Sequence, residues 1–163
     1  MDSRLAAFGR APEWQMTTTH ASAVLIGAHA LLIRGPSGAG KSRLAFDLVR
    51  LAGRGGLPFT RLVGDDRAVL EARNGRLLVR PAPALAGLIE IRGLGIRRLP
   101  YEPVAVAGLV IDLAASDAER LPAPEAGRTA VSGIELPRLA VAPDADPLPV
   151  LAAYLWSGPM PRG

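Results

Sequence analysis

A glycine-rich run at residues 35–42 constrains the fold most, because patterned segments flank it on both sides. The short apolar stretch 30–34 precedes the run and is typical of a buried strand. Residues 42–51 follow it, with apolar side chains at helical spacing and a glycine at position 53 that ends the pattern. A strand, a glycine loop and a helix in this order predict one unit of an α/β fold.

The run matches the pattern Gly-x-x-x-x-Gly-Lys-Ser of a P-loop, whose glycines let backbone amides converge on phosphate oxygens at a helix N-terminus. Lys41 can reach the β- and γ-phosphates of a nucleoside triphosphate, and the Ser42 hydroxyl can ligate Mg²⁺. The alternative is an ordinary turn in a chain with 18 glycines, which the flanking strand and helix disfavour. The predicted nucleotide-binding residues are Gly35, Pro36, Ser37, Gly38, Ala39, Gly40, Lys41 and Ser42.

Composition excludes several classes of protein. The chain of 163 residues is 49% apolar and 21% charged, which is typical of one globular domain. It contains no cysteine, so disulfides and thiolate sites are excluded, and its scattered arginines argue against a nucleic-acid partner. No apolar run reaches the roughly 18 residues of a membrane span, and residues 1–15 lack the apolar core of a signal peptide. We therefore expect a cytoplasmic protein with no membrane partner.

The remaining pattern predicts more strands than helices. The Asn74-Gly75 pair is a strong signal for a tight hairpin between two strands. This count favours a mixed, strand-rich sheet over the regular βαβ alternation of many nucleotide-binding domains. Strands are expected at 18–27, 60–64, 68–71, 76–80, 88–91 and 107–113, one or two more within 131–141, and a short helix at 147–156.

Carboxylates end two of these predicted strands. Asp65 and Asp66 follow residues 60–64, where carboxylates beside a P-loop commonly handle Mg²⁺ or the attacking nucleophile. Such a pair is also an ordinary turn or helix cap. Asp112 follows the apolar residues 109–111 near the end of the strand predicted at 107–113 and competes for the metal-assisting role.

Two further features are ordinary when each is taken alone. Residues 90–96, Glu-Ile-Arg-Gly-Leu-Gly-Ile, indicate a half-exposed strand with a surface ion pair, followed by two glycines. A single histidine such as His20, near the start of a strand, is usually structural or solvated.

In combination, the motifs resemble a known family. The order of His20, the P-loop at 35–42, Val-Gly-Asp-Asp at 63–66 and Glu-Ile-Arg-Gly-Leu-Gly-Ile at 90–96 resembles the catalytic domain of HPr kinase/phosphorylase, over roughly residues 19–141. That family uses ATP and Mg²⁺ to phosphorylate a serine of HPr, the phosphocarrier of the bacterial phosphotransferase system, and can remove the phosphate by phosphorolysis. The resemblance implies an α/β P-loop kinase fold like that of phosphoenolpyruvate carboxykinase, an HPr-like partner and a homo-oligomer, namely a hexamer.

The resemblance also implies roles for individual residues. Asp65 matches the aspartate that accepts the serine proton during phosphorylation, and His20 matches the histidine that supports this aspartate. The lysine and serine of the P-loop match the phosphate-binding and Mg²⁺-binding residues. Glu90 matches a second Mg²⁺ ligand, and Arg120 falls near a later catalytic arginine of the family.

The chain departs from the family pattern at three places, and the third is an early end, where we expect helices that engage HPr in full-length relatives to be shortened or absent. The family's N-terminal domain has no counterpart, so we expect residues 1–163 to form a single kinase domain without the regulatory one. After residues 134–138, where the family carries an arginine-rich loop tied to dephosphorylation, the sequence is Ala-Pro-Asp-Ala-Asp. Two alternatives stay open: a small-molecule kinase with the same loop, and a regulator that binds ATP and a partner without transferring phosphate.

Overall fold

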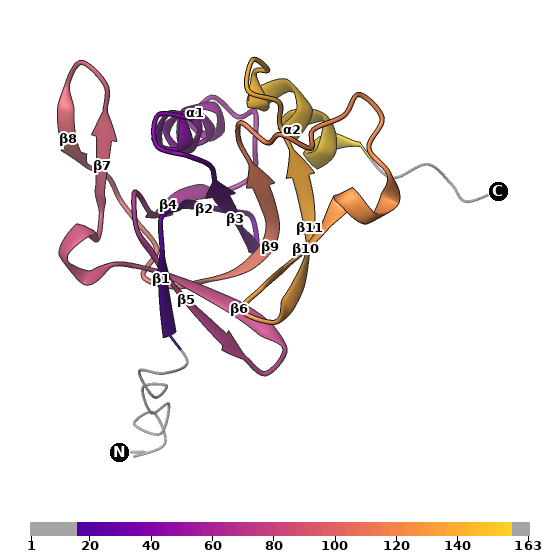
Figure 1. Cartoon of the computed structure of the whole chain (residues 1–163). Coiled ribbons are helices and arrows are strands. Elements are labelled where there is room, and N and C mark those ends of the chain that lie inside the picture. Colours follow the sequence, from indigo (N-terminus) through magenta and orange to yellow (C-terminus); the bar gives the residue numbers. More distant parts are fainter. Residues whose placement is uncertain (1–15, 158–163) are drawn as a thin grey trace.

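The computed structural model describes residues 16–157, so residues 1–15, for which no signal peptide is predicted, lie outside the described range. The described chain forms a curved sheet with two α-helices packed against it (Figure 1). In chain order the elements are β1 (Met16–Thr19), β2 (Ser22–Ile26), β3 (His29–Arg34), α1 (Lys41–Gly53), β4 (Thr60–Gly64), β5 (Ala68–Arg73), β6 (Arg76–Pro81), the 3₁₀ turn η3 (Pro83–Leu85), β7 (Leu88–Ile91), β8 (Gly95–Arg98), β9 (Ala105–Asp112), the 3₁₀ turn η4 (Pro124–Gly127), β10 (Arg128–Val131), β11 (Ile134–Ala140) and α2 (Pro147–Trp156).

Nine strands make one mixed sheet in the order β1-β5-β6-β9-β3-β2-β4, with β11 also paired to β9 and β10 to β11. Among the paired strands of the described chain, the β3–β9 and β9–β11 pairs are parallel and the others are antiparallel. This confirms the expected strand-rich mixed sheet. Because β3, β9 and β11 run in the same direction, their carboxyl ends meet at one edge of the sheet, where the loop at 35–40 begins.

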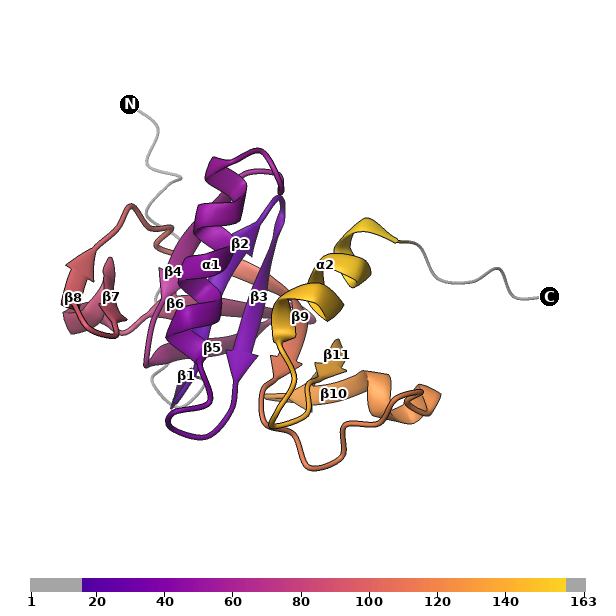
Figure 2. The same cartoon turned by 90° about the horizontal axis from the view of Figure 1, so that it is seen from above.

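Apolar side chains pack on both faces of this sheet. On one face, α1 buries Leu44, Ala45 and Leu48, and α2 contributes the fully buried Leu151 to the same cluster. The opposite face has its own cluster, centred on side chains such as Leu32 and Leu77, which the curl of the β1-β5-β6 part encloses. Figure 2 shows α1 lying along the strands, so its N-terminal end is held at the edge where β3 ends.

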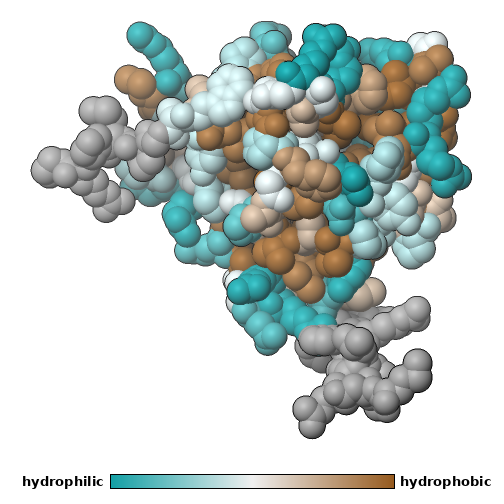
Figure 3. All heavy atoms as spheres, turned by 180° about the vertical axis from the view of Figure 1, so that it is seen from behind, coloured by the Kyte–Doolittle hydropathy of each residue, from teal (hydrophilic) through white to brown (hydrophobic). Residues whose placement is uncertain are grey.

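The surface also exposes apolar residues. Seen from behind, hydrophobic side chains reach the surface across the middle of the molecule, with hydrophilic ones around them (Figure 3).

Within residues 16–157, no helix is long and apolar enough to cross a membrane.

Two local predictions differ from the structure. The single strand expected at 18–27 is two strands, because the chain changes partners at His20 and Ala21: β1 pairs with β5, whereas β2 pairs with β3 and β4. The glycines at 93 and 95 do not end the strand region: Gly93 lies in the turn after β7, and Gly95 begins an additional strand, β8. By contrast, the Asn74-Gly75 hairpin is confirmed, with both residues at positive φ.

Candidate functional site

The predicted P-loop connects β3 to α1, as expected from its flanks. Gly38 and Gly40 have φ of 82° and 97°, a region where a side chain is strained, so the loop conformation requires glycine at both positions. Gly40 is the N-cap of α1, and no side chain caps this helix end. The first amides of α1 are therefore available to an anion, and the helix dipole favours negative charge there.

The lysine of the loop lies over the loop itself. Lys41 Nζ donates to the carbonyl oxygens of Gly35 (2.8 Å) and Pro36 (3.0 Å). The ammonium is thereby held at the beginning of the loop, directly after β3.

Asp65 is the buried carboxylate of the site. It follows β4 directly and is 3% exposed. The Ser42 hydroxyl lies 2.7 and 2.8 Å from its two oxygens, and the Ser22 hydroxyl donates to Oδ1 at 2.6 Å. The backbone amide of Glu90 donates to Oδ2 at 3.2 Å. The tertiary structure thus brings the predicted side chains of Ser42 and Asp65 together, whereas Glu90 reaches Asp65 through its backbone amide and its side chain is exposed.

The donor set fits a Mg²⁺ ion that is held partly by phosphates. Mg²⁺ prefers oxygen ligands and usually combines one or two protein oxygens with water and substrate phosphates. The Ser42 hydroxyl and the Asp65 carboxylate supply such oxygens beside the P-loop. Within residues 16–157, no group of three or more His, Cys, Asp or Glu side chains is placed so that it could hold a metal ion.

The partner of His20 in the structure is Asp66, so the support of Asp65 by His20 stays a prediction. Its Nδ1 lies 3.4 Å from Oδ1 of Asp66, and both side chains are exposed. Successive residues here point in different directions: Asp65 turns into the protein, whereas Asp66, at φ 65°, turns outward. The exposed His20–Asp66 pair thus lies next in sequence to the buried carboxylate of Asp65, which His20 was predicted to orient.

Asp112 is held by arginines, which removes it as a metal ligand. Arg34 donates to both of its oxygens, at 2.7 and 2.8 Å, and Arg138 Nε donates to Oδ2 at 2.6 Å. Burial alone raises the pKa of Asp112, but the hydrogen bonds from Arg34 and then Arg138 outweigh it and lower the pKa below its ordinary value. A carboxylate with two guanidinium partners is a structural anchor.

The same network secures the segment that follows β9. Arg138 also donates to Asp117 through two nitrogens, at 2.8 and 2.9 Å, and this bonding lowers the pKa of Asp117. Leu113 donates its amide to the carbonyl of Arg34, immediately before the P-loop. The network therefore connects the starting point of the P-loop to the segment between β9 and β10, and Figure 2 shows both on the same side of the molecule.

Arg120 lies in this anchored segment, three residues after Asp117. Its side chain is exposed, and it forms no hydrogen bond or ion pair with another residue in the range 16–157. The structure leaves it free to meet a ligand and does not bring it into contact with the buried carboxylate.

Sequence reasoning missed Ser22, Arg34 and Arg138. The structure buries Ser22 fully. The signal in the sequence was a polar residue within an otherwise apolar strand, since a buried polar group needs a hydrogen-bond partner. The two arginines each end or interrupt an apolar strand, but their common partner becomes evident only when the strands are paired.

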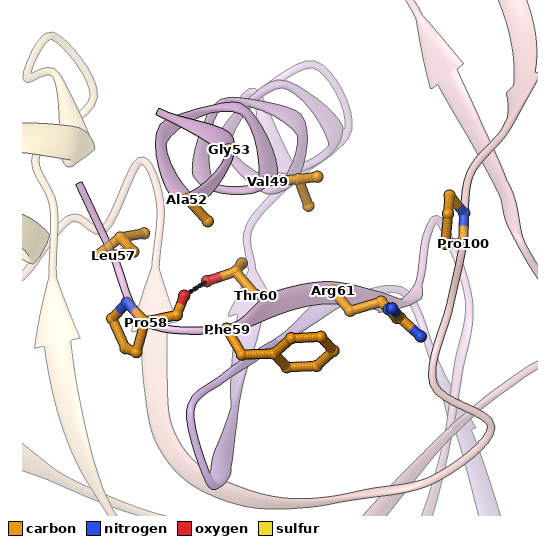
Figure 4. Close-up of a pocket in the computed structure, with 9 residues that line it drawn as sticks. All are labelled: Val49, Ala52, Gly53, Leu57, Pro58, Phe59, Thr60, Arg61 and Pro100. Carbon is orange, nitrogen blue, oxygen red and sulfur yellow. Dashed lines mark hydrogen bonds between the residues drawn. The ribbon is translucent and has the colours of Figure 1, made fainter. Parts of the chain in front are cut away.

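A cavity of about 360 Å³ lies at the other end of α1, away from the P-loop. Figure 4 shows it between the last turn of the helix and the start of β4, with Phe59 and Arg61 at its rim. The guanidinium of Arg61 lies 4.8 Å from the centre of the Phe59 ring. Because α1 separates this cavity from Lys41, the cavity is not part of the P-loop region.

Comparison with known proteins agrees with this geometry. Residues 14–99, about half of the chain, match the family described as the HPr serine kinase C-terminal domain. The HPr kinase/phosphorylase of Shouchella clausii is 42% identical over 97 residues, which are 59% of this chain and 29% of the relative. The HPr kinase/phosphorylase of Mycoplasma mycoides is 40% identical over 77 residues, 47% of this chain and 22% of that protein. The chain thus spans less than a third of the length of these relatives.

The fold has a solved counterpart. The structure of the HPr(Ser) kinase/phosphatase from Coxiella burnetii matches with a TM-score of 0.67 and 26% identity, and the match covers 85% of this chain and 87% of the other. The matching family residues include the P-loop, the aspartate pair and the hairpin at 88–98. The chain therefore belongs to the HPr serine kinase C-terminal domain family.

Proposed function

We propose that this protein transfers the γ-phosphoryl group of ATP to a serine of HPr or an HPr-like phosphocarrier. The observation that carries the proposal is the buried Asp65 carboxylate, which the P-loop serine contacts at 2.7–2.8 Å. A buried carboxylate in contact with the P-loop serine supports a role for Asp65 as the acceptor of a hydroxyl proton. The family to which the chain belongs, and the names of its relatives, support HPr as the protein substrate.

The residues have separate tasks in this reaction. The P-loop amides and Lys41 hold the β- and γ-phosphates and offset the charge that spreads over the transferred group. Asp65 accepts the proton of the attacking serine as its oxygen forms the new bond to phosphorus and the bond to the bridging oxygen of ADP breaks. Ser42 and Asp65 would hold Mg²⁺, which would supply charge neutralisation at the phosphates. Glu90 is the further proposed ligand: its backbone amide contacts Asp65, and its exposed side chain would have to turn toward the phosphates to reach the ion. The exposed Arg120 is the proposed cation for the transferred phosphoryl group.

The test is transfer of labelled γ-phosphate from ATP and Mg²⁺ to purified HPr, compared with HPr whose acceptor serine is alanine. We expect label on the first protein and none on the second. Label on neither, with ATP binding demonstrated, would overturn the proposal for this partner and favour a small-molecule kinase or an ATP-sensing regulator. Incubating phosphorylated HPr with inorganic phosphate measures the reverse reaction in the same preparation.

Lys41→Ala is expected to weaken ATP binding about tenfold or more, because the variant loses the cation nearest to the phosphates. Arg43→Ala is the matched control: it also removes a positive charge from α1, but this side chain is 88% exposed and only pairs loosely with Asp47. Fluorescence titration with a labelled ATP analogue measures both dissociation constants. Equal effects of the two substitutions would contradict the assignment of Lys41.

A further inference from the structure

The β7–β8 hairpin forms a separate two-stranded sheet that projects from the body of the protein in both Figure 1 and Figure 2. Its base is firmly anchored: Ile89 is 1% exposed and packs in the cluster that contains α1. The amide of Leu99 also donates to the carbonyl of Gly87, which closes the base of the hairpin. The hairpin is therefore an ordered projection.

The hairpin borders the phosphate site. The backbone amide of Glu90 contacts Asp65 at 3.2 Å, so one strand of the hairpin touches the proposed proton acceptor. A protein that presents a serine to Asp65 must lie over the edge of the site. The hairpin forms part of that edge.

One face of the hairpin is directed away from the protein. Glu90 pairs with Ile96 across the two strands, so the two side chains lie on the same face, opposite to that of the buried Ile89. Ile96 is 63% exposed, and Leu94 in the turn is 57% exposed. Two large apolar side chains exposed this close together on a small hairpin are typical of a binding surface.

The charges on the hairpin favour an acidic partner. Arg92, Arg97 and Arg98 are all exposed, and in the described part of the chain none forms a hydrogen bond or ion pair. Glu90 is the only acidic residue of the hairpin. Unpaired arginines next to exposed apolar groups fit a surface in which carboxylates surround an apolar side chain.

We propose that the hairpin surface, defined as Leu94 and Ile96 together with Arg92 and Arg98, docks the serine-bearing protein substrate beside the phosphate site. This inference rests on the proposed function. The partner places an apolar side chain against the two aliphatic residues and carboxylates against the two arginines. Docking by this surface sets the affinity for the protein substrate and leaves the affinity for ATP unchanged, because the P-loop lies on other elements.

The experiment measures binding of HPr by calorimetry, which does not depend on transfer, and binding of a fluorescent ATP analogue in parallel. Two double variants are used: Leu94→Ser with Ile96→Ser, and Arg92→Glu with Arg98→Glu. Each is expected to weaken HPr binding at least tenfold while ATP affinity stays within twofold. Added salt is expected to weaken HPr binding to the unmodified protein more than HPr binding to the Arg92→Glu, Arg98→Glu variant, because that variant has lost the two cations whose attraction salt screens.

The matched control is Arg54→Glu with Arg76→Glu, which changes the net charge equally at two exposed arginines on other elements. Equal weakening by this control, unchanged HPr binding in both hairpin variants, or no HPr binding by the unmodified protein would each overturn the docking proposal. A change in oligomeric mass by light scattering without a change in HPr binding would also overturn it, because the surface would then join two copies of the chain. Retained HPr binding without phosphate transfer would instead overturn the kinase function alone.

Discussion

Asp65→Asn is expected to lower the rate of phosphoryl transfer about 10²–10⁴-fold, the usual range for loss of a general base. The amide keeps nearly the shape of the carboxylate and can still accept from Ser42 or Ser22, but it cannot take up the proton of the attacking serine. Binding of ATP is expected to persist, because the P-loop is unchanged and the amide oxygen of the variant can still ligate Mg²⁺. Single-turnover transfer to HPr and titration with an ATP analogue measure the two quantities separately.

Asp66→Asn is the matched control, since it makes the same chemical change at the adjacent residue. Asp66 is exposed, and His20 is its partner at 3.4 Å. We expect the rate of phosphoryl transfer by this variant to stay within about tenfold of the rate of the unmodified protein, because Asp66 lies outside the buried contact between Asp65 and Ser42. If Asp66→Asn instead gave the larger loss, the exposed His20–Asp66 pair would be the proton acceptor and Asp65 would serve only the cation and Ser42.

Arg138→Gln is expected to lower the free energy of unfolding by about 3 kcal/mol. Arg138 is 12% exposed and donates to both Asp112 and Asp117, so its removal leaves the buried end of the network with one guanidinium instead of two. Arg128→Gln, one strand away, removes an exposed pair at 3.5 Å with Glu135 and is expected to change the same quantity by less than about 1 kcal/mol. Urea denaturation at neutral pH measures both, and similar losses for the two would contradict a special role of Arg138.

The effect of Arg138→Gln should also depend on pH. The pKa values of Asp112 and Asp117 are lowered in the folded protein by the hydrogen bonds to the arginines. A lowered pKa contributes stability that is present above the ordinary aspartate value, about 4, and is lost as pH falls through the folded value. The difference in unfolding free energy between the unmodified protein and the variant is therefore expected to shrink below about pH 4. A difference that is constant from pH 6 to pH 3 would contradict this linkage.

The local sequence determined those parts of the protein whose backbone conformation depends on residues that are close together in the chain. The P-loop and its flanks followed from glycine spacing and hydrophobic period, because only glycine adopts the positive φ at Gly38 and Gly40 without strain. The strand at 60–64 and its end before Asp65 were predicted to the residue. The hairpin at Asn74-Gly75 followed from the same logic, since both positions need positive φ.

The tertiary structure decided which of the chemistry-bearing side chains meet. Asp65 has Ser22 and Ser42 as partners because β2, β4 and α1, separated along the chain, pack side by side. His20 reached Asp66 and not Asp65 because consecutive side chains at the end of β4 point in different directions. Asp112 became an anchor for two arginines, and not a metal ligand, because β3, β9 and β11 run parallel and end at one edge. Pairing of distant strands creates these contacts, and the local pattern of the sequence carries little information about strand pairing.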